Sequence, residues 1–363
     1  MSKGQPWIAS ARFDGFFILA PAMMVTAWVV VFHRQIESVS EVPPWLWLLL
    51  MVGVDVSHVY GTIFRTYLDK REFQQRQALY VLTPLLAWVA GCFLYSLDGL
   101  FFWRVLAYLA VFHFIRQQYG FMMMYARQER AMPSYFRRID KAIIYMATIY
   151  PLVYWHCHAR AFEWFVKDDF VALNAPLLDN SAAAIYLGLL LAYAIKEIAF
   201  WKRTGTFNIP KNLLLIGTAL SWFVGVVAFD NDLAFTATNI LAHGIPYLAL
   251  IWLYGHNQTA MSGERNTTYR WPWIGKLFSW KTVPCYLVVL GALAFLEEGL
   301  WDGLVWREHG NLFGFSSLLP AITDTHTLTW LIPLLTLPQA THYLLDAFIW
   351  RIASAPPHCH IDE

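Results

Sequence analysis

Long apolar stretches recur along the whole chain and constrain its fold more than any other feature. A helix needs about 20 mostly apolar residues to cross the hydrocarbon core of a membrane. Only helices and closed barrels satisfy every backbone hydrogen bond in lipid, and these stretches are too long and continuous for barrel strands. We therefore predict an all-α, polytopic integral membrane protein of about ten transmembrane helices. The expected spans are 15–33, 44–66, 78–97, 101–125, 142–157, 181–201, 212–229, 232–254, 283–299 and 327–350.

The amino-acid composition agrees with this prediction and excludes several other classes. Hydrophobic residues make up 58% of the 363 residues and charged residues 14%, whereas soluble proteins carry about 25% charged residues. Such a chain is neither disordered nor suited to a water-soluble globule. Its 18 Trp, 18 Tyr and 26 Phe suit the aromatic belts at membrane interfaces. A net charge of +1 gives no basic surface that would indicate nucleic acid as a partner.

Lysine and arginine are distributed unevenly between the predicted loops, and this sets the orientation. The loops after the second, fourth, sixth and eighth spans are rich in these residues, whereas 34–43, 98–100, 159–180 and 230–231 carry few. Positive charge marks the cytoplasmic side, so both termini are predicted to be cytoplasmic. The first span lacks the cleavage site of a secretory signal, and we expect it to be retained. The expected location is a cell inner membrane.

The expected domain organisation is a single transmembrane helical bundle. The bundle covers 15–351, between a cytoplasmic N-terminal segment, 1–14, and a cytoplasmic tail, 352–363. Segment 300–326 is amphipathic and rich in aromatic residues. We expect it to lie along the outer interface of the membrane.

Histidines inside four of the even-numbered spans are the most informative residues. They are His58, His113, His243 and His342. Ionisable side chains are costly in hydrocarbon, so they usually face the bundle interior and mark function. The four helices are predicted to run in the same direction, and the histidines fall within a depth of about 6 Å. One such histidine is more often a hydrogen-bonded packing residue, but four at one level predict a common central pocket.

Carboxylates near these histidines favour a metal site. Asp346 follows His342 by four residues and Asp55 precedes His58 by three, spacings that put each pair on one helix face. Imidazole and carboxylate together suit non-haem iron, copper or zinc. We predict one or two non-haem iron ions bound by the four histidines and Asp346. Asp55 is a further ligand, an orienting partner or a catalytic residue, and haem is the alternative cofactor.

Three amides in the same spans are predicted to support the cofactor. Gln117, Asn239 and Gln339 lie at suitable offsets from the histidines along their helices. A histidine that binds a metal needs a hydrogen-bond partner for its other ring nitrogen. We therefore expect these amides to orient the imidazoles.

Two further charged residues are candidates for the site. Arg116, a predicted catalytic residue, lies inward of the histidines, where it would hold an anionic head group or a propionate, or pair with Asp346 or Asp55. Glu197 is the second candidate, but a position at the membrane interface beside Lys196 explains it equally well.

Several common motifs are absent. The sequence has no Gly-rich phosphate loop, GxSxG elbow, HExxH zinc motif or CxxCH haem-attachment motif, so these chemistries gain no support. The repeated histidine boxes typical of membrane desaturases and alkane hydroxylases are also missing. Two His-Cys-His triplets, 156–158 and 358–360, fall on opposite predicted sides of the membrane, so we do not expect them to share a metal.

These features leave three functional hypotheses. The first is an integral-membrane, metal-dependent oxidoreductase of the oxygenase, hydroxylase or desaturase type. Its substrate would be a membrane lipid or another apolar small molecule that enters between helices near Met122–Met124, and it would need an external electron donor. The alternative is a proton- or ion-coupled membrane transporter that uses the same polar residues. The third is a haem or quinone redox subunit with paired histidines.

Overall fold

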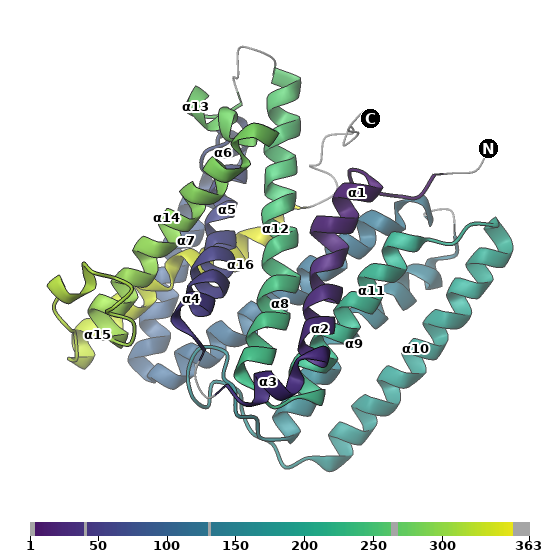
Figure 1. Cartoon of the computed structure of the whole chain (residues 1–363), viewed down its shortest axis with the longest axis horizontal. Coiled ribbons are helices and arrows are strands. Elements are labelled where there is room, and N and C mark those ends of the chain that lie inside the picture. The colour runs from purple at the N-terminus through teal and green to yellow at the C-terminus, as the bar shows by residue number, and fades with distance from the viewer. Residues whose placement is uncertain (1–3, 40–41, 130–131, 263–267, 351–363) are drawn as a thin grey trace. The chain divides into compact units, whose positions relative to one another are not determined.

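The computed structural model describes residues 4–39, 42–129, 132–262 and 268–350, and in these ranges the chain is helical without a β-strand (Figure 1). An isolated β-bridge joins Asp69 and Tyr269. Eight of the described helical segments are long and apolar enough to cross a membrane, and each overlaps a predicted span. They indicate a membrane protein. The eight are Ala11–Val31, Pro44–Arg65, Gln77–Leu97, Gly99–Glu129, Pro176–Thr204, Ile209–Ala228, Asp232–Met261 and Trp280–Trp306.

The other two predicted spans are helical but differ from the eight. The span at 142–157 belongs to α9, Ser134–Cys157, whose first two turns carry several charged residues. The span at 327–350 is divided into α15, Thr325–Leu335, and α16, Leu337–Ile349. Pro338 lies in the first turn of α16, where a proline starts a helix but cannot donate a backbone hydrogen bond to the preceding turn. The number of crossings and the side of the termini stay predictions.

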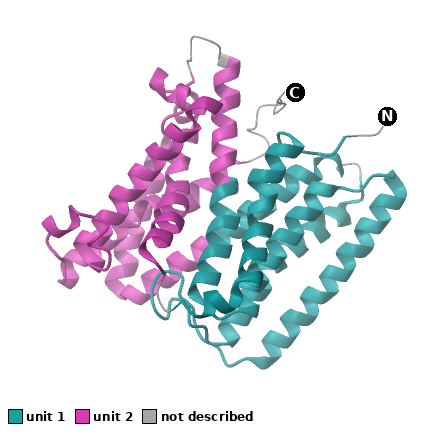
Figure 2. Cartoon of the chain, in the orientation of Figure 1, with its two compact units in different colours: residues 1–40, 111–246, 356–363 teal, residues 41–110, 247–355 magenta. Residues whose placement is uncertain are grey.

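The chain divides into two compact units, each described by itself (Figure 2). Unit 1 is made of Met1–Ser40, Val111–Pro246 and Pro356–Glu363, and unit 2 of Glu41–Ala110 and Tyr247–Ala355. Two helices contribute residues to both: α8, Gly99–Tyr125, and α12, Asp232–Ser262. The single bundle predicted for 15–351 is not tested by this division, and the predicted tail, 352–363, lies outside the described residues.

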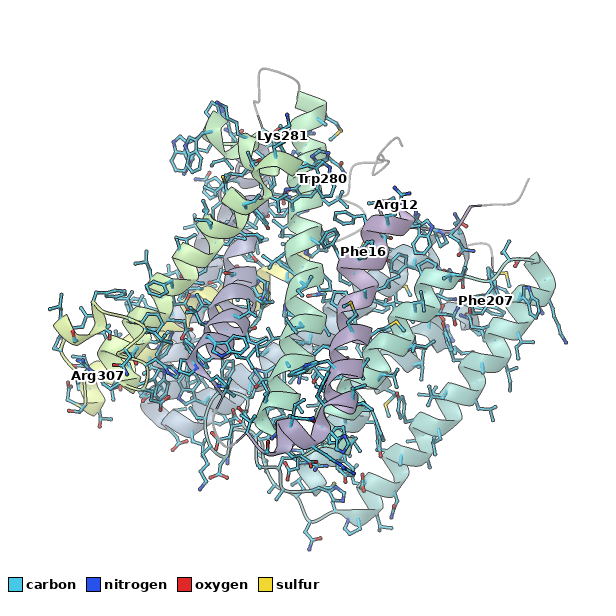
Figure 3. All side chains as sticks on the ribbon, in the orientation of Figure 1. Arg12, Phe16, Phe207, Trp280, Lys281 and Arg307 are labelled. Atoms are coloured by element: carbon cyan, nitrogen blue, oxygen red, sulfur yellow. The ribbon has the colours of Figure 1, made fainter. Side chains whose placement is uncertain are left out.

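Unit 1 is built on α9, which packs against α10, Pro176–Thr204, and α11, Ile209–Trp222. Asn208 caps α11 by accepting a hydrogen bond from the Lys211 amide. One face of α10 presents bare apolar side chains, among them Leu187 and Leu191, as lipid-facing helices do. Figure 3 shows Arg12 and Phe16 close together near the start of the unit. Its other elements are α1, Ala11–Asp14; η1, Gly15–Leu19; α2, Ala20–Val31; α3, His33–Glu37; η3, Ala126–Glu129; and η4, Phe223–Ala228.

Unit 2 is built on α14, Val283–Trp301, which packs against η2, Leu48–Val56, and α5, Ser57–Arg65. Helix α16 packs against α5 and α7. Within the predicted outer segment 300–326, Phe313 is fully buried against Ala294. Lys281 and Arg307 mark the two ends of the α14 region (Figure 3). The other elements are α4, Pro44–Trp47; α6, Lys70–Gln75; α7, Gln77–Leu97; α13, Pro272–Gly275; η6, Lys276–Phe278; η7, Trp280–Thr282; η8, Asp302–Trp306; and η9, Ser316–Leu318.

Candidate metal centre

Unit 1 contains a pair of buried histidines, His113 on α8 and His243 on α12. Their Nε2 atoms lie 3.1 Å apart, and both side chains are almost fully excluded from solvent. The ring of Phe114 stacks on His243, with 3.7 Å between the centroids. Gln117 Nε2 donates a hydrogen bond of 3.0 Å to the His243 carbonyl. The pair is therefore oriented by a stacked ring and by a contact to the backbone.

Unit 2 contains the second pair, His58 on α5 and His342 on α16. The two rings meet edge to face with 5.0 Å between their centroids. Both residues are buried, with 2% and 1% of their surface exposed. In each unit the possible ligand atoms of the pair lie within 4.8 Å of each other, so each pair could hold a metal ion.

Side chains position the imidazoles of the unit 2 pair. A hydrogen bond of 2.6 Å joins Thr62 Oγ1 and His342 Nδ1, and the same hydroxyl lies 2.9 Å from the Tyr247 hydroxyl. Asp55 Oδ1 lies 3.7 Å from His58 Nδ1. The hydrogen bond at His342 Nδ1 fixes that ring and directs its Nε2 toward a ligand, as is usual for a histidine that binds a metal.

The local helix geometry contributes to this arrangement. Segment η2 is a π-helix that contains Asp55 and ends at Val56, directly before His58's helix begins at Ser57. The Ser57 hydroxyl donates to the carbonyl of Val52, five residues earlier. A π-segment rotates the residues that follow it relative to a regular α-helix, and such segments are frequent at functional sites.

The predicted carboxylate and amide partners have different surroundings. Asp346 is buried on α16 one turn after His342, but its carboxylate is not among the ligand atoms that gather with the histidines. Gln339 donates a hydrogen bond of 2.7 Å to Glu297. Asn239 donates to the Phe235 carbonyl of its own helix. Their assignments as metal ligand and cofactor-binding residues stay predictions.

Arg116 is held by aromatic side chains in unit 1. Its guanidinium donates a hydrogen bond of 3.2 Å to the Tyr145 hydroxyl and lies 5.4 Å from the ring centre of Tyr119. Such contacts fix a guanidinium by hydrogen bonding and cation–π attraction. The predicted role in binding an anionic group stays a prediction.

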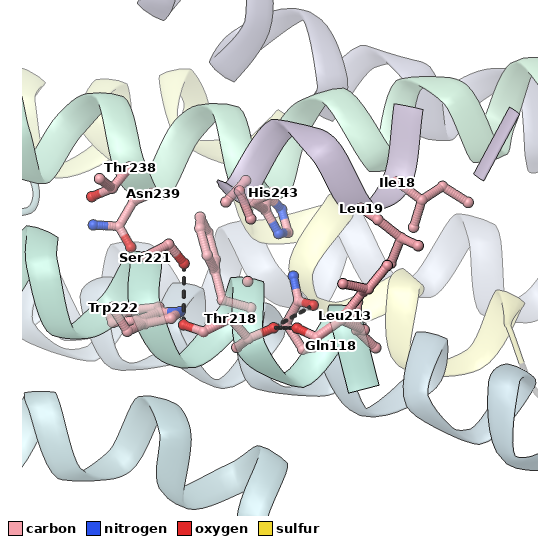
Figure 4. Close-up of a pocket in the computed structure, with 15 residues that line it drawn as sticks. Ile18, Leu19, Gln118, Leu213, Thr218, Ser221, Trp222, Thr238, Asn239 and His243 are labelled. Carbon is pink, nitrogen blue, oxygen red and sulfur yellow. Dashed lines mark hydrogen bonds between the residues drawn. The ribbon is translucent and has the colours of Figure 1, made fainter. Parts of the chain in front are cut away.

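A small cavity lies beside His243 within unit 1 (Figure 4). It has room for about one water molecule. Polar side chains line part of it, where Thr218 donates to Gln118 and Ser221 donates to the Thr218 carbonyl. Asn239 lines the same cavity, which places this predicted residue near His243 without a described hydrogen bond between them.

Several buried charges, among them Lys211 and Glu297, were not predicted as site residues, and Glu197 was only a weaker candidate. Glu197, for which an interfacial position was an equal alternative, is buried and forms an ion pair with Lys211. Lys211 follows the basic loop after α10, so its sequence position resembles that of an exposed loop residue. Glu297 of α14 is also buried, and its acidic side chain within an apolar stretch was the one available signal.

Three other described histidines contact backbone carbonyls. His256 and His156 each use Nδ1 to contact a backbone carbonyl, of Phe278 and Val171 respectively. His158 contacts the Tyr154 carbonyl in the same way. The first His-Cys-His triplet thus shows no convergence of its rings on one point, and the second, 358–360, lies outside the described residues.

The fold and these pairs define a helical membrane protein with buried histidines that could hold a metal. No protein-family model matches the chain, and neither a curated protein nor a solved structure matches it.

Proposed function

We propose that the protein is an integral-membrane, metal-dependent oxidoreductase in which the two histidine pairs bind non-haem iron. The observation that carries this proposal is the pairwise convergence of buried imidazoles, with 3.1 Å between the Nε2 atoms of His113 and His243. Two nitrogens at that separation can both lie about 2.1 Å from one metal ion. A hydrogen bond from the N–H of one imidazole to the free nitrogen of the other fits the same distance, so metal analysis decides between the two arrangements.

The surroundings of the pairs favour a resident metal over simple packing. Thr62 and Asp55 contact the Nδ1 atoms of His342 and His58, which leaves the Nε2 atoms for coordination. An all-imidazole set with carboxylates nearby suits redox-active iron or copper as well as zinc. When bound, iron would supply the one-electron and dioxygen chemistry that the side chains lack.

Haem suits the unit 1 pair less well. The Nε2 atoms of His113 and His243 lie 3.1 Å apart, which leaves no room for a porphyrin ring between them. We therefore prefer non-haem iron to a haem held between these two residues.

An apolar substrate is proposed from the environment of the pairs. The helices that carry the histidines are rich in apolar side chains, and Met122 on α8 is fully buried. A membrane lipid or another apolar small molecule could reach such a site from the bilayer, while the apolar shell excludes water. Electrons would come from an external donor.

Metal analysis of the purified protein tests the proposal. We expect about one or two iron ions per chain and an optical spectrum without a Soret band. Alanine substitutions of His58, His113, His243 and His342 should each remove iron, whereas His256→Ala, a histidine with a backbone contact, should retain it. Loss of all iron in every one of the four variants would indicate one shared centre, and loss of half would indicate two.

A second measurement tests the reaction class. The iron-loaded protein is given a chemical reductant, isotopically heavy dioxygen and a total membrane lipid extract, and the lipids are examined by mass spectrometry. We expect an oxidised lipid or a new double bond that His243→Ala does not produce. A protein that purifies without metal, or a Soret band, would overturn the proposal in favour of transport or of a haem subunit.

A further inference from the structure

A network of buried charges connects four elements of unit 1. It joins Glu129 of η3, Asp140 of α9, Lys196 and Glu197 of α10, and Lys211 of α11, and we call these five residues the charge cluster. Each is at least 95% buried. Charges this far from water are stable only when they are paired and hydrogen-bonded.

The two lysines are surrounded by carboxylates. Lys211 Nζ lies 2.6 and 2.8 Å from the two oxygens of Glu129 and 2.6 Å from Glu197 Oε1. Lys196 Nζ lies 2.6 Å from the same Glu197 oxygen and donates a short hydrogen bond to Asp140 Oδ1. An ammonium group has three protons to donate, and those of Lys211 are all engaged.

Amide groups also donate to both glutamates. Asn208 Nδ2 donates to Glu129 Oε1 at 2.7 Å, and Asn212 Nδ2 donates to Glu197 Oε2 at 2.8 Å. Asp140 differs from both glutamates, because its Oδ2 atom is fully buried and has no hydrogen-bond partner among the described residues.

The charge cluster is not electrically balanced. Three carboxylates face two ammonium groups, which leaves one surplus negative charge if every group is ionised. A metal cation that approached to balance it would be repelled by both lysines. A proton on a carboxylate removes the charge without needing space of its own, and Asp140 Oδ2 is the oxygen that lacks a donor.

The electrostatic surroundings of Asp140 also favour a proton on its carboxylate. Burial raises the pKa of Asp140 above its ordinary value of 3.8, Lys211 and Lys196 oppose the rise without reversing it, and Glu129 adds to it. Tyr193 and Glu197 of α10 also face the carboxylates. The nearby Arg203 lies over the Phe136 ring, 6.0 Å from its centre.

We propose that the charge cluster is a proton-binding site, in which Asp140 Oδ2 holds one proton taken from water. Asp140 lies just before the predicted span 142–157, on the side where the basic loops are expected. The proton would therefore exchange with the cytoplasmic solution. The site is independent of the histidine pairs and of the metal proposed for them.

Infrared spectroscopy tests the proton directly. At neutral pH the wild-type protein should show the carbonyl band of a protonated carboxylic acid, with the usual shift in heavy water. Asp140→Asn should lose one component of this band. Thr148→Val, which alters another buried polar residue of α9, should keep it.

The pH dependence of thermal unfolding gives a second test. Because the folded state keeps the proton at pH values where the unfolded chain has released it, the contribution of Asp140 to wild-type stability falls as the pH rises above about 3.8. Asp140→Asn cannot lose this proton. The apparent Tm of the variant minus that of the wild type should therefore increase with rising pH, by about 2 °C or more. This difference should level off above the folded-state pKa of Asp140.

A second variant provides the test if Asp140→Asn does not fold. Glu197→Gln removes a different negative charge, balances the cluster and should let Asp140 ionise, so the same infrared component should disappear. The proposal is overturned if wild type lacks the component or if both variants keep it. It is also overturned if stability at fixed pH depends on replacing sodium by potassium or choline, which would indicate a bound metal cation.

Discussion

The two units each combine a buried histidine pair with a buried charge network, but they balance the charges differently. In unit 2 the arginines Arg65 and Arg76 flank Glu72, while Asp69 accepts a hydrogen bond from the Tyr254 hydroxyl. Two cations there match two carboxylates. In unit 1 two lysines face three carboxylates. A buried carboxylate must be neutralised by a cation or by a proton. The unit 2 network uses cations, and the unit 1 network is proposed to use a proton.

The histidine pairs differ in a parallel way. In unit 2, Thr62 and Asp55 contact the imidazole nitrogens themselves. In unit 1, Phe114 stacks on the His243 ring and Gln117 donates a hydrogen bond to the His243 carbonyl. Substitution of Thr62 should therefore affect metal binding more than substitution of Gln117.

The largest effect is expected at the centre of the unit 1 network. Lys211→Met would leave Glu129 and Glu197 buried beside a single lysine, and breaking such a buried pair costs about 3–5 kcal/mol. The variant should accumulate poorly and unfold at a much lower temperature in detergent. Lys202→Met, at an exposed position of α10, is the control. Equal melting temperatures for the two variants would show that the network contributes little stability.

The unit 2 histidine pair should respond next most strongly. Thr62→Val removes the hydrogen bond to His342 Nδ1, and loss of such a partner lowers metal affinity by about 10–100-fold. The affinity is measured by competition with a chelator. Thr66→Val, at the equally buried residue that directly follows α5, should leave it unchanged. If both variants bind iron as the wild type does, Thr62 does not orient a metal ligand.

The unit 2 charge network should give a pH-dependent effect. Burial by itself would raise the pKa of Glu72, but Arg65, the Tyr80 hydroxyl and Arg76 together hold it below its ordinary value of 4.5. A lowered pKa stabilises the fold above the ordinary value, and this stabilisation is lost as the pH falls through the folded-state pKa.

Glu72→Gln should accordingly lose about 1–3 kcal/mol at neutral pH and should approach wild-type stability in acid. Thermal unfolding of both proteins between neutral and acidic pH measures the difference. This trend is opposite to that expected for Asp140→Asn. Identical pH profiles for Glu72→Gln and Asp140→Asn would show that the two charge networks are not neutralised in different ways.

The smallest effect is expected for the backbone contact in unit 1. Gln117→Leu removes one hydrogen bond to the His243 carbonyl, worth about 0.5–1.5 kcal/mol. Iron affinity should change much less than in Thr62→Val, because no imidazole nitrogen loses a partner. A loss of iron affinity as large as that of Thr62→Val would contradict the difference expected between the two histidine pairs.

Much of the helical architecture follows from local sequence. Eight predicted spans coincide with apolar helices of the structure. Four histidines predicted to face inward are buried, and each has another of the four as a neighbour in its own unit. The helical spans could be predicted because an apolar run of sufficient length has few alternatives in lipid, and an imidazole within such a run is expected to avoid the lipid.

The sequence by itself determined which segments are helical and which polar side chains need a buried partner, because both depend on the chemistry of neighbouring residues. Only the tertiary structure decided which residues pair with each other. Lys211 and Glu129 are 82 positions apart, and Gln339 contacts Glu297 rather than an imidazole. The rotation of each helix about its axis and the reach of each side chain decide such contacts, and neither is encoded within one helix.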